Sequence, residues 1–408
     1  MLHCPPLLLL LSGVPDAGQI PLVMLIIFGS AKLLAEIFER IGQPGLVGEI
    51  LAGALIGPGV LHWIEPSAFL TALGDLGAMF LLFRVGLEVK SSELLKVGGT
   101  ATLVATFGVI VPQILGWAIM VAWGAPHVEA IFVGAAMVAT SVGITAQVLS
   151  AKGLLHHKAS QIILAAAVID DVLGLLVLAV VSSLAKGQLN LLAVLVTTVM
   201  AAGFTVLVAL LGTKTMNHVM PRVTKTLRAG EVQFNFAMVL LFALALLAVY
   251  TGVAGIIGAF LAGLASSEGV GQRVRDLAHG VTELLVPFFL AGIGLHLGLR
   301  SFTSLPVILL ALAILVAAIV SKLIGCGLGA WSLGRTDMLR VGLGMVPRGE
   351  VGMVVAQLGL SMGVIAGDVY GVVVFMAVAT TLVAPLLLNI AFKGVAPLEP
   401  QVEEFHLG

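Results

Sequence analysis

The sequence predicts an all-α polytopic membrane protein, and two observations lead to that fold class. Of 408 residues, 60% are hydrophobic and only 10% are charged, with a mean hydropathy of +1.16. A soluble domain carries about 25% charged residues, so this composition is typical of an integral membrane protein. The second observation is that the apolar residues fall into membrane-length runs separated by short polar segments.

Composition and motifs also exclude several functions. The chain has no run of basic residues that would indicate nucleic-acid binding. It has no phosphate-binding loop and no nucleophile elbow, which argues against an ATP-driven pump or a hydrolase. Cys4 and Cys326 lie too far apart in the sequence to indicate a disulfide framework, and we expect no cofactor.

We expect thirteen transmembrane segments, because about 17–25 apolar residues cross a bilayer as a helix. The segments are 20–39, 44–62, 70–88, 99–123, 129–151, 159–185, 190–213, 232–250, 252–267, 279–298, 303–334, 338–364 and 367–394.

The distribution of basic residues predicts the orientation. With alternating sides, one side collects nearly all the Lys and Arg of the connections, and positive charge marks the cytoplasm. The N-terminus is then outside and the C-terminus is cytoplasmic. Merging 232–250 with 252–267 would move four arginines outside, so we keep them as two segments. The cytoplasmic residues are Arg40, Lys90, Lys96, Lys152, Lys158, Lys214, Arg222, Lys225, Arg228, Arg273, Arg275, Arg335, Arg340 and Lys393, against Lys186 and Arg300 outside.

Asp170 and Asp171 lie side by side inside the apolar run 159–185. One Asp at the centre of a membrane helix costs roughly 2.5–3.5 kcal/mol even on lenient scales, and such residues usually serve function. Lys322 lies at the same depth: it is about twelve residues from the cytoplasmic end of its segment, and Asp170 is about eleven from the start of its own. We therefore expect the lysine and an aspartate to meet at the bilayer centre.

Two segments contain helix-disrupting residues at that same depth. Thr140 and Ser141 interrupt 129–151, and the sequence PRGEVG, which begins at Pro347, interrupts 338–364. Interrupted segments in corresponding positions of two halves predict crossed, broken helices at a transport site. The triplets 99–185 and 303–394 start from opposite sides and so form an inverted-topology repeat. Arg348 and Glu350 are expected to offset the partial charges of the half-helix ends.

The order of motifs resembles bacterial sodium/proton antiporters of the cation:proton antiporter type two family, over nearly the whole chain. The motifs are QPGLVGEILAGALIGPGVL, LGAMFLLFRVGLEVK, TSVGITA, IDDVLGL and PRGEVG. The adjacent aspartates resemble the electrogenic branch of that family. Arg84 is a departure, because relatives are expected to have an apolar residue there.

The resemblance implies roles for these residues. Asp171 is the main carboxylate that binds sodium or a proton, Asp170 pairs with Lys322, and Thr140, Ser141 and the broken backbone help to coordinate the ion. It also implies a core domain, 99–185 and 303–394, that moves like an elevator against a dimerisation scaffold, 1–98 and 186–302. Residues 395–408 form a short cytoplasmic tail. The expected partners are the lipid bilayer of the bacterial inner membrane, Na⁺, protons and a second copy of the chain.

Our hypothesis is that two protons enter for each sodium ion expelled, one on Asp171 and one on the Asp170–Lys322 pair. Potassium/proton exchange in the same fold is the first alternative. A sodium-coupled symporter is the second, because the sequence does not exclude a larger substrate cavity. A channel is disfavoured, since no selectivity ring is evident.

Other charged residues favour structural roles. Lys32 is expected to pair with Glu36 one turn on. Arg84 lies near a cytoplasmic helix end, where a long side chain reaches the interface. His156 and His157 titrate in a range that suits pH sensing, but they lie in a connection where a solvated loop is the favoured interpretation.

Overall fold

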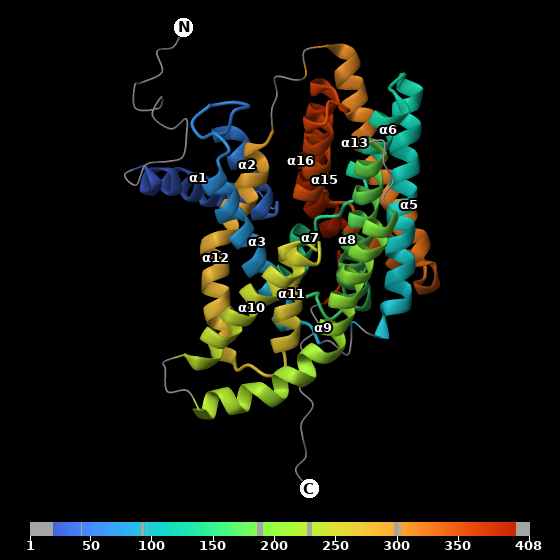
Figure 1. Cartoon of the computed structure of the whole chain (residues 1–408). Helices are drawn as coiled ribbons and strands as arrows, with labels where there is room; N and C mark the ends of the chain where they lie inside the picture. Colours follow the sequence, from blue (N-terminus) through green and yellow to red (C-terminus); the bar gives the residue numbers. More distant parts are fainter. Residues whose placement is uncertain are drawn as a thin grey trace.

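A computed structural model describes residues 19–41, 43–90, 94, 96–185, 191–226, 231–297, 302 and 304–396, and every regular element within these ranges is helical (Figure 1). The α-helices are α1 (Ile20–Arg40), α2 (Gly45–Ile56), α3 (Ala68–Glu88), α5 (Gly98–Trp123), α6 (His127–Ala136), α7 (Val142–Ala151), α8 (Lys158–Ala185), α9 (Leu191–Thr226), α10 (Val232–Tyr250), α11 (Gly255–Ser266), α12 (Gln272–Leu295), α13 (Leu305–Gly329), α14 (Arg335–Gly344), α15 (Glu350–Ser361) and α16 (Gly367–Ala391), with a 3₁₀ turn, η3 (Trp331–Leu333).

Each of the thirteen predicted segments contains a helix or a pair of half-helices, but not all are full-length spans. Within the described residues, nine helices are long and apolar enough to cross a membrane. The segments 44–62 and 252–267 are shorter as helices than expected, since α2 and α11 have 12 residues each. Gly57, Pro58 and Gly59 follow α2 directly, which explains its early end.

The predicted split between 232–250 and 252–267 is present in the structure. The helix α10 ends at Tyr250 and α11 begins at Gly255. The turn between them places Gly252 at φ +88°, a conformation that glycine adopts without steric cost. The chain therefore reverses here, as the charge distribution requires.

Both predicted helix breaks are present. The helix α6 ends at Ala136 and α7 begins at Val142, so Thr140 and Ser141 lie in the gap. Similarly, α14 ends at Gly344 and α15 begins at Glu350, which leaves Pro347 in a non-helical stretch. Proline cannot donate a backbone hydrogen bond, and the preceding residue is biased away from helical geometry.

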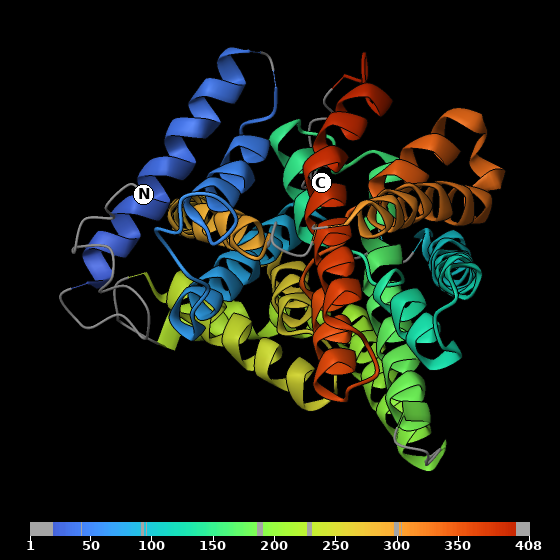
Figure 2. The same cartoon turned by 90° about the horizontal axis from the view of Figure 1, so that it is seen from above.

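Contacts divide the helices into two groups, which Figures 1 and 2 show side by side. In one group, α3 packs on α11 and α12, α2 packs on α1 and α12, and α11 packs on α9 and α10. In the other, α5 packs on α6, α8 and α13, and α16 packs on α13, α14 and α15. The groups meet through α3 with α7, α8 with α9, and α2 with α16.

Contacts within the second group follow a matching pattern. The helix α5 packs on α6 and α8, and α13 packs correspondingly on α14 and α16. The half-helix α7 packs on α16, while α14 packs on α8. The half-helices α6 and α15 also contact each other. The second group therefore places the two broken segments between α8 and α16.

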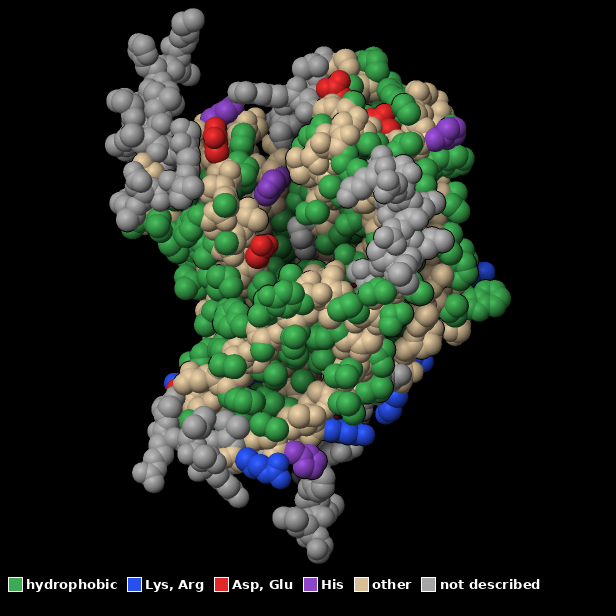
Figure 3. Space-filling model, in the orientation of Figure 1, with side chains coloured by type: hydrophobic (Ala, Val, Ile, Leu, Met, Phe, Trp, Pro, Cys, Tyr) green, Lys and Arg blue, Asp and Glu red, His purple; other side chains and the backbone are tan. Residues whose placement is uncertain are grey.

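Close backbone contacts hold α3 against α11. A Cβ atom on Gly86 would overlap the carbonyl oxygen of Phe260, and one on Gly263 would overlap the carbonyl oxygen of Phe83. These glycines allow the two helices to approach each other through their backbones, as small residues do in membrane helix pairs. The face of the molecule shown in Figure 3 is largely apolar, with Lys and Arg mostly at its lower end.

Candidate functional site

Asp170 and Lys322 form a fully buried ion pair. The Lys322 Nζ donates to Asp170 Oδ1 at 3.1 Å and to Oδ2 at 3.3 Å. The side chains are 1% and 0% exposed, so neither charge is compensated by bulk water. Losing one partner would leave the other charge buried, which is far more costly than the pair itself. The contact expected from depth matching between α8 and α13 is therefore present.

Gly108 on α5 provides the room in which this pair sits. A Cβ at Gly108 would lie 2.7 Å from Cys326 Sγ, 3.3 Å from Lys322 Nζ and 3.8 Å from Asp170 Oδ1. Any larger residue would press on both the thiol and the ammonium group. Sequence reasoning missed this glycine, since the LVATFGVIVPQ run contains no charged residue that would draw attention to it.

Asp171 faces a different neighbour from Asp170. Its Oδ2 accepts a hydrogen bond of 3.3 Å from the backbone N–H of Ala254, the residue that precedes α11. The N-terminal end of a helix carries a partial positive charge, which favours a carboxylate there. Consecutive helical residues point about 100° apart, and the two aspartates accordingly serve two different surfaces. Asp170 faces within its helix group, and Asp171 faces the other group.

The two helix breaks contact each other directly. The backbone N–H of Ser141 donates to the carbonyl oxygen of Pro347 at 2.9 Å. A Cβ on Gly349 would lie 2.7 Å from both Cβ and Oγ of Ser141, so only glycine fits at this crossing. The hydroxyl of Thr145 donates to the Gly344 carbonyl, which is otherwise a free helix-end acceptor, at 2.7 Å.

The Thr140 hydroxyl in this break is without a hydrogen-bond partner. Its Oγ1 is buried and makes no hydrogen bond, whereas buried hydroxyls normally have one. It therefore makes no direct hydrogen bond to Asp171. An unused oxygen on the broken segment suits a ligand oxygen for a cation, and Ser141 contributes its backbone to the crossing instead.

Arg348 is the largest fully buried side chain described. Its Nη2 donates to the Ala318 carbonyl at 3.2 Å, while Nε and Nη1 have no partner. Its backbone is held by a pair of threonines that sequence reasoning missed: Thr381 Oγ1 donates to Arg348 O at 2.5 Å, and Arg348 N donates to Thr380 Oγ1 at 3.2 Å. The sequence could have indicated their role, because these two polar residues lie in the middle of the apolar segment 367–394. The side chain of Glu350 lies outside the described residues.

A cavity of about 280 Å³ opens beside Asp171, on the side of the molecule opposite the basic residues. Ala254, which bonds Asp171, lines it together with Asp75 and His296 of the first group and Met353 of the second. Two cavities on the basic side, of about 620 and 760 Å³, also lie between the groups. The acidic pair thus lies near the boundary between two helix groups that have space on both sides.

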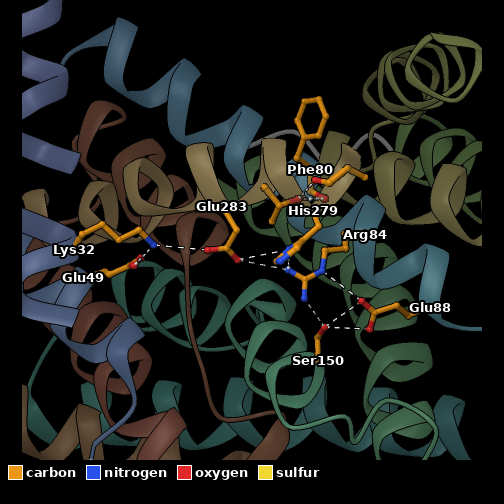
Figure 4. A network of polar contacts seen from close by, with 10 residues as sticks. Lys32, Glu49, Phe80, Arg84, Glu88, Ser150, His279 and Glu283 are labelled. Carbon is orange, nitrogen blue, oxygen red and sulfur yellow. Dashed lines mark hydrogen bonds and ion pairs between the residues drawn. The ribbon is translucent and has the colours of Figure 1, made fainter. Parts of the chain in front are cut away.

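The prediction that Lys32 pairs with Glu36 is wrong. Lys32 Nζ lies 2.9 Å from Glu49 Oε1, and Glu36 pairs with Arg40 at 2.7 Å. Glu49 is nearly buried, so it attracts the lysine more strongly than an exposed carboxylate on the same helix would. The favoured role of Arg84, reaching to the interface, is also incomplete, because it bonds α7 and α12 (Figure 4). His157 Nε2 lies 2.9 Å from the Ala396 carbonyl oxygen.

The crossed breaks, the buried carboxylate–ammonium pair and the two helix groups define a polytopic membrane protein of the broken-helix transporter class. The profile of the family described as "Sodium/hydrogen exchanger, transmembrane" matches residues 23–394, and the chain belongs to that family.

Relatives over nearly the full length are similar in sequence. The Na⁺/H⁺-K⁺ antiporter GerN of Bacillus cereus is 35% identical, covering 92% of this chain and 95% of its own length. The high-affinity Na⁺/H⁺ antiporter NhaS3 of Synechocystis sp. is 30% identical, covering 93% and 92%. The solved structure of the sodium proton antiporter MjNhaP1 from Methanocaldococcus jannaschii at pH 8 has a TM-score of 0.61 at 20% identity, covering 92% of this chain and 97% of its own, which shows the shared fold.

Proposed function

We propose that this protein is a secondary active antiporter that exchanges sodium ions, or lithium ions, for protons. The observation that carries the proposal is the arrangement of Asp170 and Asp171: one is locked to Lys322, and its neighbour turns to the boundary between the helix groups. Similarity to proteins named Na⁺/H⁺ antiporters supports the same activity.

Competition for one carboxylate accounts for obligatory exchange. A hard cation such as Na⁺ prefers carboxylate, carbonyl and water oxygens, the chemistry that Asp171, the Thr140 hydroxyl and the broken backbone offer. A proton binds the same Asp171 oxygens and cancels the charge that attracts the cation. Asp171 therefore carries either sodium or a proton, but never both. We propose Asp170, Thr140 and Ser141 as the supporting groups of this site.

The proposed second proton resides on the Asp170–Lys322 pair. The Lys322 ammonium group contacts both Asp170 oxygens while the pair is intact, and a proton on Asp170 takes the place of that contact when the pair separates. An exchange of two protons for one sodium ion moves net charge. We propose on this basis that the chain belongs to the electrogenic two-aspartate branch of the cation:proton antiporter type two family, and that Arg348 and Glu350 offset charge at the crossed helix ends.

The proposed movement is an elevator. The core comprises 99–185 and 303–394, and the scaffold comprises 1–98 and 186–302, with 395–408 as the cytoplasmic tail. Sparse contacts between the groups and cavities on both sides of their boundary support this division. The matching contacts of α5–α8 and α13–α16 support an inverted repeat. We propose thirteen membrane crossings in all, as the apolar runs predict. A homodimer, joined through the scaffold, follows from the family resemblance.

We place the protein in the bacterial inner membrane, with the N-terminus outside and the C-terminus in the cytoplasm. The concentration of Lys and Arg at one end of the molecule supports this orientation (Figure 3). That end holds the cytoplasmic ends of α3 and α7 and the start of α12. Asp75 and His296 then line a cavity on the outer side, and Lys32 and Glu49 line one on the cytoplasmic side.

Potassium/proton exchange is the second candidate, because the relative at 35% identity is named a Na⁺/H⁺-K⁺ antiporter. Purified protein in liposomes, with a pH-sensitive dye inside, separates the two. Proton movement driven by Na⁺ or Li⁺ but not K⁺ is the expected result. An imposed membrane potential should alter the rate; a rate insensitive to potential would exclude the two-proton stoichiometry.

A further inference from the structure

Arg84 is a charged residue that the exchange site does not use, and it lies where an apolar residue was expected. Its guanidinium group joins three structural elements, as Figure 4 shows. Nε donates to Glu88 Oε1 on α3 at 3.3 Å, and Nη2 donates to Ser150 Oγ on α7 at 3.2 Å. Nη1 lies 3.0 Å from the Nδ1 atom of His279 on α12.

Ser150 is held from two sides. Its hydroxyl accepts from Arg84 and donates to Glu88, at 3.1 Å to Oε2 and 3.4 Å to Oε1. Ser150 lies in the last turn of α7, the half-helix that begins directly after Thr140 and Ser141. A clamp on this end therefore fixes the axis of the segment whose other end carries the proposed ion ligands. The half-helix is only about 15 Å long, so a tilt at one end moves the other.

Space on both sides of the clamp would allow α7 to move. Gln147, Ala151 and Lys152 line the cavity of about 620 Å³, and Gly153 and His156 line the one of about 760 Å³. Arg84 and Glu88 face the second cavity, while Glu49 and Glu283 face the first. The clamp is thus a polar bridge between two water-accessible spaces.

His279 lines the second cavity and contacts Arg84 there. Its side chain is 55% exposed, and its Nδ1 faces a group that can only donate hydrogen bonds, so the ring must be neutral there to accept from Arg84. Protonation would remove the acceptor and place two cations side by side. It would also favour Glu283, whose Oε1 is 3.7 Å from the same Nδ1 and 3.8 Å from Arg84 Nη1.

Charged and titratable groups from several helices surround His279. From α3 they are Arg84 and Glu88; from α12 itself, Arg275, Asp276 and Glu283; from the rest of the cavity, Lys90, His156 and Glu268. Glu49 of α2 and Lys32 of α1 reach Glu283 from the other side, Lys32 at 3.9 Å. The helix α10, which also packs on α12, contributes no charged residue.

We propose that Arg84 is a positioning residue for the exchange site: it holds α7 against α3 while His279 is neutral and releases α7 when cytoplasmic acid protonates His279. The proposal rests on the antiport function in one respect, because α7 carries the proposed ligands of the exchanged ion. The clamp itself is a property of α3, α7 and α12. Its response to pH can be measured without transport.

Two spin labels test the position of α7. Glu39 of α1 and Lys152 after α7 line the same cavity and are both exposed. Labels on Glu39→Cys and Lys152→Cys, in a Cys4→Ser background, report the distance between α1 and α7 in liposomes. At pH 8 we expect one narrow distance distribution. At pH 6 a second population should appear, because protonation of His279 removes the acceptor of the Arg84 hydrogen bond.

Three variants distinguish the contribution of Arg84 to the position of α7 from that of His279. Arg84→Leu should show the second population at both pH values, and Arg84→Lys should restore part of the single distribution at pH 8. His279→Gln stays neutral and should show the pH 8 distribution at both values. Arg40→Leu is the matched control for loss of an arginine from an i,i+4 ion pair, since Arg40 contacts only Glu36 of its own helix in the described structure. His218→Gln is the control for loss of a histidine, whose ring nitrogen bonds a carbonyl of its own helix.

The transport assay on the same liposomes completes the test. The pH profile of exchange should change in His279→Gln and not in His218→Gln. A single narrow distribution in Arg84→Leu at pH 8 would overturn the clamp. An unchanged pH response in His279→Gln would overturn the role of His279. Absence of sodium/proton exchange in a protein with the expected distance changes would count against the proposed function alone.

Discussion

The backbone N–H of Ser141 donates to the carbonyl oxygen of Pro347 at 2.9 Å, so the two breaks of the membrane helices are joined by one hydrogen bond. Pro347 lacks an N–H, and its own carbonyl lies outside any helical ladder. Each break thus satisfies a backbone group that the other leaves free. This contact joins two residues that lie 206 positions apart in the sequence (141 and 347), so the two breaks form one structural unit.

Gly349→Ala tests how tightly that unit is packed. The added methyl group would lie 2.7 Å from two side-chain atoms of Ser141, so we expect a loss of about 1–3 kcal/mol in stability. Combining it with Ser141→Gly removes the overlap and should recover most of the loss. Thermal unfolding of the purified single and double variants measures this coupling; strictly additive losses would contradict the contact.

Thr140→Val should separate ion binding from stability. The Thr140 hydroxyl has no hydrogen-bond partner, so valine should leave the melting temperature unchanged or slightly raised. The apparent affinity for sodium should fall, since one ligand oxygen is lost. Thr145→Val is the matched control: it removes the hydrogen bond to Gly344 and should cost about 1 kcal/mol. Equal sodium affinity in wild type and Thr140→Val would remove Thr140 from the ligand set.

Asp171→Asn should abolish exchange while the protein still folds. Asparagine retains an oxygen that can accept from the Ala254 N–H, so the local contact survives. It cannot exchange a proton for a cation. Sodium-driven proton movement in liposomes is the measurement, with Asp368→Asn in the exposed first turn of α16 as control. Full activity in Asp171→Asn would rule out the assigned role.

Lys322→Ala should lower the stability of the protein strongly, whereas exchange should persist. Removing one partner of a buried pair costs about 3–5 kcal/mol, since it leaves the Asp170 charge uncompensated. The double variant Lys322→Ala with Asp170→Asn should be more stable than Lys322→Ala alone. Exchange should persist in Lys322→Ala with an altered pH profile, because Asp170 can still bind a proton. Lys152→Ala, at an exposed position, is the control. A double variant less stable than the single one would argue against the pair.

Hydrophobic runs and charge placement predicted most of the fold. The positions of the two breaks followed from Thr140-Ser141 and from Pro347, because a proline or a cluster of small polar residues at mid-membrane weakens the hydrogen-bond ladder of a helix. The depth of Lys322 predicted its partner, since helical rise converts sequence position into height. Neither argument specifies which helices are neighbours, and so neither could show that Gly108 makes room for the pair.

Contacts between distant segments could not be predicted. Lys32 has Glu36 one turn away, yet it pairs with Glu49, because packing of α1 on α2 brings a nearly buried carboxylate within reach. The sequence around Arg84 does not indicate its contacts with Ser150 and His279, because these residues belong to helices far along the chain. The unpartnered Thr140 hydroxyl is likewise a property of three-dimensional packing. The proposed ligand role of Asp171 remains a prediction.

The hydrogen-bond donor that Ala254 presents to Asp171 is its main-chain N–H. Every amino acid except proline presents that group, so position 254 can vary over evolution without erasing the contact. The side chain at position 254 is therefore free to change in volume and polarity while the Asp171 carboxylate keeps this hydrogen bond.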